Sequence, residues 1–450
     1  MNFSDHKDCS SDKPPKKTAE ESINVEGCKC FSFGKESTKG NRTIMVLGAT
    51  GAGKSTLING MINYILGVEW EDPYRFKLVD EGQSKSQAES QTSEVTAYRI
   101  NHQEGFKIEY TLTLVDTPGF GDTRGIERDR MIVEQLRNLF STELGVSEID
   151  AVCFVAQASL ARLTPTQKYV FDSVLSIFGK DVAENIRVLV TFADGKRPQV
   201  LEAINASGVP CPKTKDGLPD HFKFNNSALF AQNKSSAAES MSGEDDEDGG
   251  FDQMFWNMGT RSMQRFFVAL NKVDTKSLTL TKEVLRERKQ LEISVENLKK
   301  QVKDGLAKLE EIKETAEQLK EHEAEISRNK NFEFEALIDK LRLEYDLVKA
   351  EVVTLMERSA QCLNRLKEIA LKPNPLSTPE YIDMLIEGEK YEAKPGWKQR
   401  VQSLIDMREK ADYMAKVERG EKLLQSPTTD SQGFNQGQTK NNDNQDKVLI

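Results

Sequence analysis

The chain has 450 residues, of which 30% are charged and 37% hydrophobic, and its formal net charge is −10 at pH 7. This length predicts two or three structural units with a sizeable core. The negative charge argues against nucleic-acid binding, because a polyanion requires a basic face. Since no apolar run reaches about 18 residues and the N-terminus is polar, neither a membrane span nor a secretory signal is expected.

The cysteines predict a reducing, cytoplasmic setting. The six of them are scattered along the chain, at Cys9, Cys28, Cys30, Cys153, Cys211 and Cys362. The close pair Cys28 and Cys30 has neither the C-x-x-C spacing nor a neighbouring histidine, so no zinc site is expected there. Scattered thiols of this kind are typical of cytosolic proteins.

Residues 1–38 predict a mobile arm, because they are rich in Ser, Asp and Lys and offer little to bury. A nucleotide-binding domain is expected over residues 41–275. It begins with the apolar run 43–47, which predicts a strand, and a glycine-rich stretch follows. That stretch comprises Gly48, Ala49, Thr50, Gly51, Ala52, Gly53, Lys54, Ser55 and Thr56.

This stretch has the pattern G-x-x-x-x-G-K-[ST] of a phosphate-binding loop (P-loop) between a strand and a helix. Glycines adopt positive φ angles readily, so successive backbone N–H groups can point at one phosphate, and the helix dipole adds to the attraction. We expect Lys54 to contact the β- and γ-phosphates and the Ser55 hydroxyl to bind Mg²⁺. A turn that binds nothing is the alternative, which the complete motif disfavours.

The polar stretch 81–96 is expected to contain switch I, a segment whose threonine closes over Mg²⁺ and the γ-phosphate. Both Thr92 and Thr96 are candidates for this catalytic and metal-binding threonine. The pattern over Val95–Ile100 predicts a strand, which would place Thr96 inside the sheet. Thr92 is therefore favoured.

A second nucleotide-responsive segment, switch II, is predicted where the strand over 107–115 ends. Asp116 can hold Mg²⁺ through water, and the Gly119 N–H can donate to the γ-phosphate. Phe120 follows, at the position where many hydrolysing switches carry a water-orienting glutamine. This substitution predicts slow intrinsic hydrolysis.

The strand predicted over 186–190 ends in Thr191, Phe192, Ala193 and Asp194, where guanine-specific proteins carry N/T-K-x-D. The aspartate carboxylate can accept hydrogen bonds from the N1–H and the amino group of guanine. Adenine offers no such pair of donors, so ATP should be rejected. Phe192 replaces the usual lysine, and its ring can cover the base.

Two further stretches bear on this base site. Residues 271–274 (Asn-Lys-Val-Asp) match the motif letter by letter, but they follow a helical pattern over 251–271 rather than a strand, so Asp194 is preferred. After a short strand over 221–224, the backbone of the Ser-Ala pair can meet guanine O6 and the asparagines can contact the base. The residues concerned are Asn225, Asn226 and Ser227. An acidic loop is expected over 235–250.

The last third of the chain is predicted to be helical. Apolar residues recur at alternating steps of three and four over 278–330, which predicts a coiled coil, either with another chain or folded back on the nucleotide domain. A helical region follows over 331–420, and the Asn/Gln/Ser-rich tail 425–450 is expected to be disordered. The predicted fold is therefore α/β, a three-layer P-loop NTPase sandwich with a mostly parallel sheet, followed by an all-α region with a coiled coil.

The motifs at 48–56, 116–122, 191–194 and 224–226 resemble those of septins and of immune-associated nucleotide-binding (AIG-type) GTPases. The resemblance covers 41–275 and, loosely, the helical half. It implies a slow or regulated GTPase that uses GTP or GDP with Mg²⁺. It also implies a homo-oligomer assembled through the G domain and/or the coiled coil, with peripheral membrane contact in some members.

Three functions remain open. The favoured one is a nucleotide-controlled switch whose slow GTP hydrolysis is coupled to oligomerisation. The second is a scaffold or filament-type protein that retains GTP or GDP structurally. The third is an ATP-dependent kinase or ATPase, against which Asp194 argues. GTP turnover that rises with protein concentration would favour the switch, whereas retained nucleotide without turnover would favour the scaffold.

Overall fold

The computed structural model describes residues 20–25, 27–79, 92–122, 126–142, 145–231, 246–321, 328–373, 379–393 and 396–425. The chain divides into two compact units. One consists of Met1–Glu292 with Gln361–Ala415, and the other of Ile293–Ala360 with Lys416–Ile450. Most of the predicted switch I stretch, most of the acidic loop and the predicted tail beyond residue 425 lie outside the described residues.

The first unit is built on an eight-stranded sheet of order β1-β2-β4-β5-β3-β7-β8-β9. Its strands are β1 Glu20–Val25, β2 Cys28–Phe33, β3 Asn41–Gly48, β4 Val95–Ile100, β5 Thr111–Asp116, β7 Ala151–Gln157, β8 Ile186–Thr191 and β9 His221–Lys223. Only the pairs β1–β2 and β4–β5 are antiparallel among these neighbours. A two-stranded ribbon pairs β6 (Glu148–Ile149) with β10 (Lys276–Ser277).

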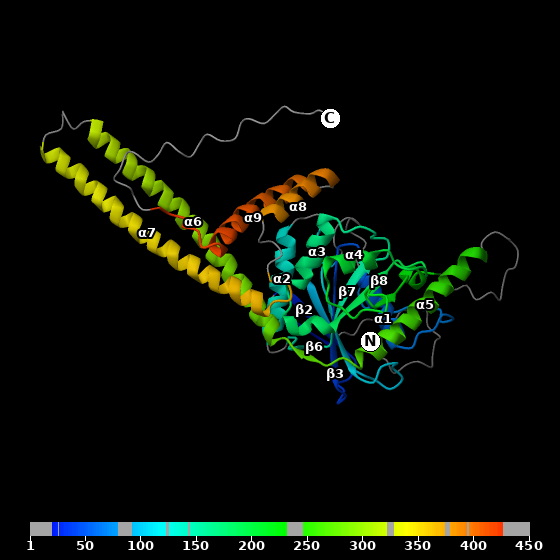
Figure 1. Cartoon of the computed structure of the whole chain (residues 1–450). Helices are drawn as coiled ribbons and strands as arrows, with labels where there is room; N and C mark the ends of the chain where they lie inside the picture. The colour runs from blue at the N-terminus through cyan, green and yellow to red at the C-terminus, as the bar shows by residue number, and fades with distance from the viewer. Residues whose placement is uncertain are drawn as a thin grey trace, which may run out of the picture. The chain divides into compact units, whose positions relative to one another are not determined.

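Helices cover both faces of this sheet (Figure 1). One face packs against α1 (Lys54–Ile65) and α5 (Asp246–Leu270). The other packs against α2 (Ile126–Ser141), α3 (Pro165–Leu175) and α4 (Val200–Ser207). Strand β3 is buried on both faces, since Ile44 and Val46 contact the first layer and Met45 and Leu47 the second. This arrangement confirms the predicted three-layer α/β fold with a mostly parallel sheet.

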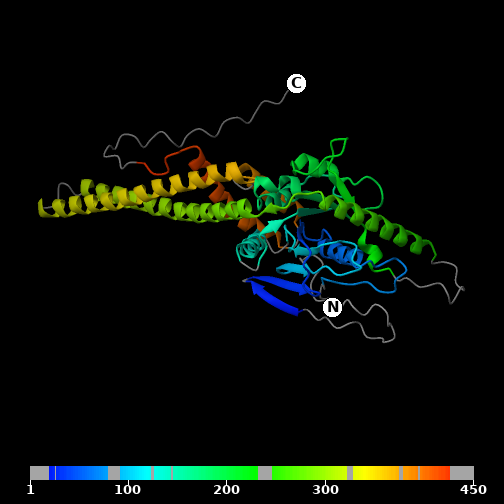
Figure 2. The ribbon, with the colours of Figure 1, turned by 90° about the horizontal axis from the view of Figure 1, so that it is seen from below.

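The N-terminal segment corrects one prediction. Residues 20–25 and 28–33, which were predicted to lie in a mobile arm, form β1 and β2 at the edge of the sheet (Figure 2). The side chains of β2 alternate, because Cys28 and Cys30 pack on one face of the sheet while Phe31 and Phe33 pack on the other. Such alternation is the signature of a strand covered on both sides.

The structure also shifts the start of the helix predicted over 251–271. Helix α5 begins at Asp246, so the last residues of the predicted acidic loop belong to its first turns. Acidic residues at a helix N-terminus are stabilised by the helix dipole, which explains why the helix extends into this stretch.

Two helices near the C-terminus belong to the first unit, the second of them as far as Ala415. Helices α8 (Pro379–Glu392) and α9 (Trp397–Glu418) contribute Ile382, Leu385 and Leu404 to the core beneath α2 and α3. The chain reaches them through the segment after α7, which Arg288 ties down: its guanidinium donates to the carbonyls of Ser176, Lys372 and Pro373.

The second unit is a helical hairpin of α6 (Thr279–Glu321) and α7 (Arg328–Ile369) over their residues in 293–360. Lys308 of α6 pairs with Glu344 of α7, and Gly305 of α6 lies beside the Val348 side chain of α7. Residue numbers that increase along α6 therefore meet residue numbers that decrease along α7. The two helices are therefore antiparallel, and they lie side by side in both views (Figures 1 and 2). In this unit the apolar face predicted as a coiled coil contacts the next helix of the same chain.

Candidate nucleotide-binding site

The P-loop joins β3 to α1 as predicted. Gly51 and Gly53 have φ angles of 76° and 77°, and Gly53 is the left-handed N-cap of α1. Residues with a Cβ adopt this conformation at a cost, which explains the two glycines. Consequently the turn directs backbone N–H groups and the N-terminus of α1 toward one side, as an anion site requires.

Polar side chains hold the loop in place. Lys54 is only 7% exposed, and its ammonium donates to the carbonyls of Ala49 at 3.0 Å and Gly48 at 3.3 Å. Gln157 Nε2 donates to Gly51 O at 2.8 Å, and Thr191 Oγ1 donates to Ala52 O at 2.7 Å. Sequence reasoning did not identify Gln157, although its place at the end of a buried parallel strand was the available signal, because such strand ends meet at one edge.

Ser55 and Thr92 are brought together. Their hydroxyl oxygens lie 3.2 Å apart, while the Asp116 carboxylate at the end of β5 is fully buried. Two oxygens that bind one Mg²⁺ at about 2.1 Å in adjacent octahedral positions lie about 3 Å apart, so this arrangement fits Mg²⁺. Thr96 lies inside β4, where its hydroxyl donates to Glu94 O at 3.4 Å. Of the two candidate threonines, the structure places Thr92 beside Ser55.

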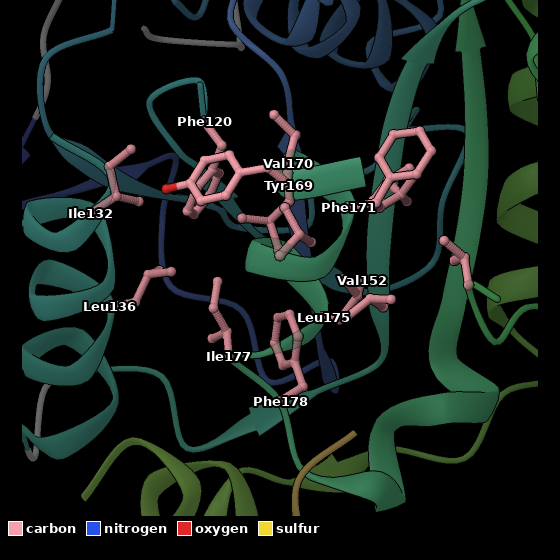
Figure 3. Packing of buried hydrophobic residues seen from close by; sticks show 14 of the residues in the cluster. Phe120, Ile132, Leu136, Val152, Tyr169, Val170, Phe171, Leu175, Ile177 and Phe178 are labelled. Carbon is pink, nitrogen blue, oxygen red and sulfur yellow. The ribbon is translucent and has the colours of Figure 1, made fainter. Parts of the chain in front are cut away.

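Switch II is joined to the P-loop by backbone hydrogen bonds. Phe120 N donates to Gly48 O at 3.1 Å, and Thr50 N donates to Phe120 O at 2.9 Å. A Cβ on Gly119 would lie 2.6 Å from the Thr50 nitrogen, so only glycine fits here. The Phe120 ring is fully buried beside Tyr169 and Val170 of α3 (Figure 3), and therefore points into the core rather than at the P-loop.

Asp129 of α2 anchors the continuation of switch II. Its carboxylate accepts hydrogen bonds from the Gly121 N–H at 3.1 Å and from the Tyr169 hydroxyl at 2.8 Å. Burial raises the pKa of this carboxyl to about 7, despite the opposing effect of the two donors. A carboxyl with a pKa near neutral pH is therefore hydrogen-bonded directly to the switch II backbone at Gly121. The sequence pattern predicted neither α2 nor a role for Asp129.

The predicted base-reading residues lie where β8 ends. Phe192 has a φ of 53°, rare for a residue with a side chain, and its ring lies 3.4 Å from the Cβ position of Gly53. The ring is 58% exposed, so one part covers the P-loop and the rest is open to a ligand. Asp194 is exposed, and its Oδ1 accepts from Lys196 N at 3.0 Å, which fixes the turn.

The adjacent loop follows β9. Ala193 N donates to Phe224 O at 3.0 Å, which joins the two loops, and the Asn225 side chain accepts from Ser227 N at 3.3 Å. The Asn226 side chain lies beside Gly60 of α1.

The competing Asn271–Asp274 stretch lies elsewhere. It follows the end of α5, and Val273 O accepts from Arg42 at the start of β3. Because the P-loop lies at the other end of β3, this stretch is remote from the candidate site.

Comparison with known proteins adds a family. Residues 42–210 match the model of the AIG1 family. These residues are therefore similar to an AIG1-type P-loop GTPase domain. The match begins at the second residue of β3 and contains the P-loop, the end of β5 and the end of β8. The match supports GTP binding by this domain.

Solved structures similar to the AIG1-type domain are distant. Toc33 from Arabidopsis thaliana in complex with GDP and Mg²⁺ is 15% identical, with a TM-score of 0.31, over 50% of this chain and 85% of that one. A second structure is described by the statement that dimerization is important for the GTPase activity of the chloroplast translocon components atToc33 and psToc159. It is 18% identical, with a TM-score of 0.33, over 50% of this chain and 84% of that one. No curated protein matches the chain. None of the described helices is long and apolar enough to cross a membrane.

Proposed function

We propose that this chain is a Mg²⁺-dependent GTP-binding protein that hydrolyses GTP slowly and acts as a nucleotide-controlled switch coupled to oligomerisation. The observation that carries the proposal is the distance of 3.2 Å between the Ser55 and Thr92 hydroxyls, together with the burial of Asp116 at the end of β5, the strand next to β3. A hydroxyl from the P-loop and one from switch I, next to a carboxylate, is the donor set that phosphoryl-transfer switches use for Mg²⁺. Bound Mg²⁺ would supply neutralisation of the phosphate charge.

The remaining residues of the phosphate end act through position and charge. When nucleotide binds, the Lys54 ammonium would replace its hydrogen bonds to the loop carbonyls by hydrogen bonds to the β- and γ-phosphates. This change would need no backbone movement, because the ammonium already lies inside the loop. The Gly119 N–H would donate to the γ-phosphate. Thr92 contacts Ser55 and would also be held by Mg²⁺ and the γ-phosphate when GTP is bound, so loss of the γ-phosphate would release switch I, which is the basis of the proposed switch.

The base end would select guanine. The Asp194 carboxylate would accept from N1–H and the 2-amino group, and the exposed part of the Phe192 ring would stack on the base. Asn225 and Asn226 would order the neighbouring loop, with the backbone of Ser227 close to O6. ATP lacks the donor pair that Asp194 requires, which argues against the kinase or ATPase alternative.

Hydrolysis is expected to be slow because the residue after Gly119 is Phe120, whose side chain has no polar group that could position the attacking water. Its ring is fully buried, so it cannot orient the attacking water as a glutamine would. A partner or a second copy would have to supply this function, which is why we couple turnover to homo-oligomerisation through the G domain. The buried Phe120 ring is equally consistent with the scaffold alternative, in which GTP or GDP is retained with little turnover.

Binding and turnover test the proposal directly. Purified protein is expected to bind GTP and GDP far more tightly than ATP, with binding weakened by EDTA, and its GTP turnover per chain should rise with protein concentration. Thr92→Val should weaken the Mg²⁺-dependent component, whereas the matched control Thr96→Val should not, since Thr96 lies within β4. Equal effects of both substitutions would refute the metal assignment. Retained nucleotide with turnover independent of concentration would support the scaffold instead.

A further inference from the structure

Helix α2 holds the end of switch I through two of its side chains. The Arg128 guanidinium donates to the carbonyl of Ser93, and Gln135 Oε1 accepts from the Val95 N–H at 3.1 Å. Arg128 and Gln135 are seven positions apart, so they lie about two turns from one another on the same side of the helix. The backbone that immediately follows Thr92 is therefore fixed to α2 at two points.

The same helix also holds switch II. The carboxylate of Asp129, the residue after Arg128, accepts from the Gly121 N–H at 3.1 Å. The Tyr169 hydroxyl of α3 donates to the same carboxylate at 2.8 Å, which fixes its orientation. Neighbouring side chains on a helix point in directions about 100° apart, so they can contact different segments. Two consecutive residues of α2 thus contact the backbones of the two switches, Arg128 that of switch I and Asp129 that of switch II.

The contact with Ser93 bears on the proposed metal site because the preceding residue is Thr92. The Thr92 hydroxyl lies 3.2 Å from that of Ser55. Mg²⁺ requires nearly ideal octahedral geometry with ligands at about 2.0–2.1 Å, so a hydroxyl must be held closely in place to bind it. Groups that orient a metal ligand typically contribute about 10- to 100-fold to the metal affinity. Arg128 is in a position to orient Thr92 in this way.

We propose that α2 couples the two switches, and that Arg128 is the positioning residue that holds Thr92 at the Mg²⁺ site. The proposal rests on the proposed function, since it takes Thr92 as a Mg²⁺ ligand in the GTP-bound state. Arg128 and Asp129 lie in one helical turn, so the positions of Ser93 and Gly121 constrain one another. Release of Thr92 on loss of the γ-phosphate is therefore transmitted through α2 to Gly121, and the coupling acts equally in the opposite direction.

Titration of Mg²⁺ into the full chain, loaded with GDP or with the GTP analogue GMPPNP, tests the role of Arg128. Arg128→Met should weaken Mg²⁺ binding about ten-fold with GMPPNP and less than about two-fold with GDP, because Thr92 reaches the metal only when a γ-phosphate is present. A general loss of structure would weaken both. Arg128→Lys keeps a charged donor and should recover most of the affinity. Arg130→Met is the matched control on the same helix, since Arg130 pairs with Glu127 at 2.7 Å.

A double-mutant cycle shows whether Arg128 acts through Thr92. Arg128→Met added to Thr92→Val should weaken Mg²⁺ binding in the GMPPNP state no further than Thr92→Val alone. Independent effects that multiply would overturn the positioning role. An effect of Thr92→Val with none of Arg128→Met would also overturn it, while leaving the proposed function intact. A wild-type chain without Mg²⁺-dependent GMPPNP binding would refute both.

Hydrogen exchange at the Gly121 amide tests the coupling to switch II. With GMPPNP and Mg²⁺ bound, Thr92→Val should speed this exchange at least about three-fold, although position 92 lies in the other switch. In the Arg128→Met background the same substitution should have no effect on Gly121, because the connection to α2 has been removed. Exchange that Thr92→Val leaves unchanged, or speeds equally in both backgrounds, would show that α2 does not couple the switches through Arg128.

Discussion

The buried carboxyl of Asp129 makes the stability of the first unit depend on pH in a direction opposite to that of most aspartates. Its pKa is raised from 3.8 to about 7 in the folded protein, chiefly by burial, with Asp122 adding to the rise and Arg128 opposing it. Between these two values the folded state binds a proton that the unfolded state has released. The free energy of unfolding must therefore fall as pH rises from about 4 to about 7.

The magnitude follows from the shift. About three pKa units at about 1.36 kcal/mol each give at most about 4 kcal/mol lost by pH 8 relative to pH 4. Asp129→Asn removes the titration while keeping an oxygen that can accept from Gly121 N and the Tyr169 hydroxyl. Between pH 5 and pH 8 the free energy of unfolding of the wild type should therefore fall by up to this amount more than that of Asp129→Asn.

Urea unfolding followed by tryptophan fluorescence measures this difference. Trp70, Trp256 and Trp397 all lie in the first unit, so the signal reports the part of the chain that contains Asp129. Glu127→Gln on the same helix is the control, because Glu127 is exposed. Parallel pH profiles for the wild type and Asp129→Asn would show that Asp129 has an ordinary pKa, and the argument from its burial would fail.

Two further substitutions test the close contacts of the first unit. Gly119→Ala should abolish nucleotide binding without unfolding the chain, because its Cβ would lie 2.6 Å from the Thr50 nitrogen and displace the P-loop; unchanged GTP binding in a calorimetric titration would contradict this geometry. Arg288→Met should lower the free energy of unfolding by about 2–4 kcal/mol and expose the segment after α7 to protease, because three carbonyls lose their donor, whereas the exposed Arg286→Met should do neither. Equal protease resistance of the two arginine variants would show that Arg288 does not secure that segment.

The candidate nucleotide-binding site was predictable because its residues lie in short motifs that are contiguous in the sequence. A glycine-rich turn between an apolar strand and a helix has one common use, and the register of β5 and β8 against their neighbours brings Asp116 and Asp194 to the same edge as Lys54. The preference for Thr92 over Thr96 depended on strand patterning alone, and the structure places Thr92 beside Ser55.

Other features were beyond single-sequence reasoning for identifiable reasons. Strands β1 and β2 were hidden because a composition averaged over 38 residues conceals a six-residue alternation carried by cysteine and phenylalanine. The apolar repeat in α6 showed that the helix needs a partner, but not that α7 of the same chain provides it within the hairpin. Gln157 and Asp129 act on backbone groups far away in sequence, and no local pattern marks such contacts.

Guanine selection by Asp194 is the central claim, and nucleotide binding by Asp194→Asn tests it most directly. The substitution reverses one hydrogen bond to the base, so GTP affinity should fall about a hundred-fold or more while xanthosine triphosphate, which presents an oxygen in place of the amino group, should bind more tightly than to the wild type. Asp274→Asn is the matched control from the competing stretch and should bind GTP normally. Unchanged GTP binding by Asp194→Asn, or its loss in Asp274→Asn, would contradict the assignment of the base site.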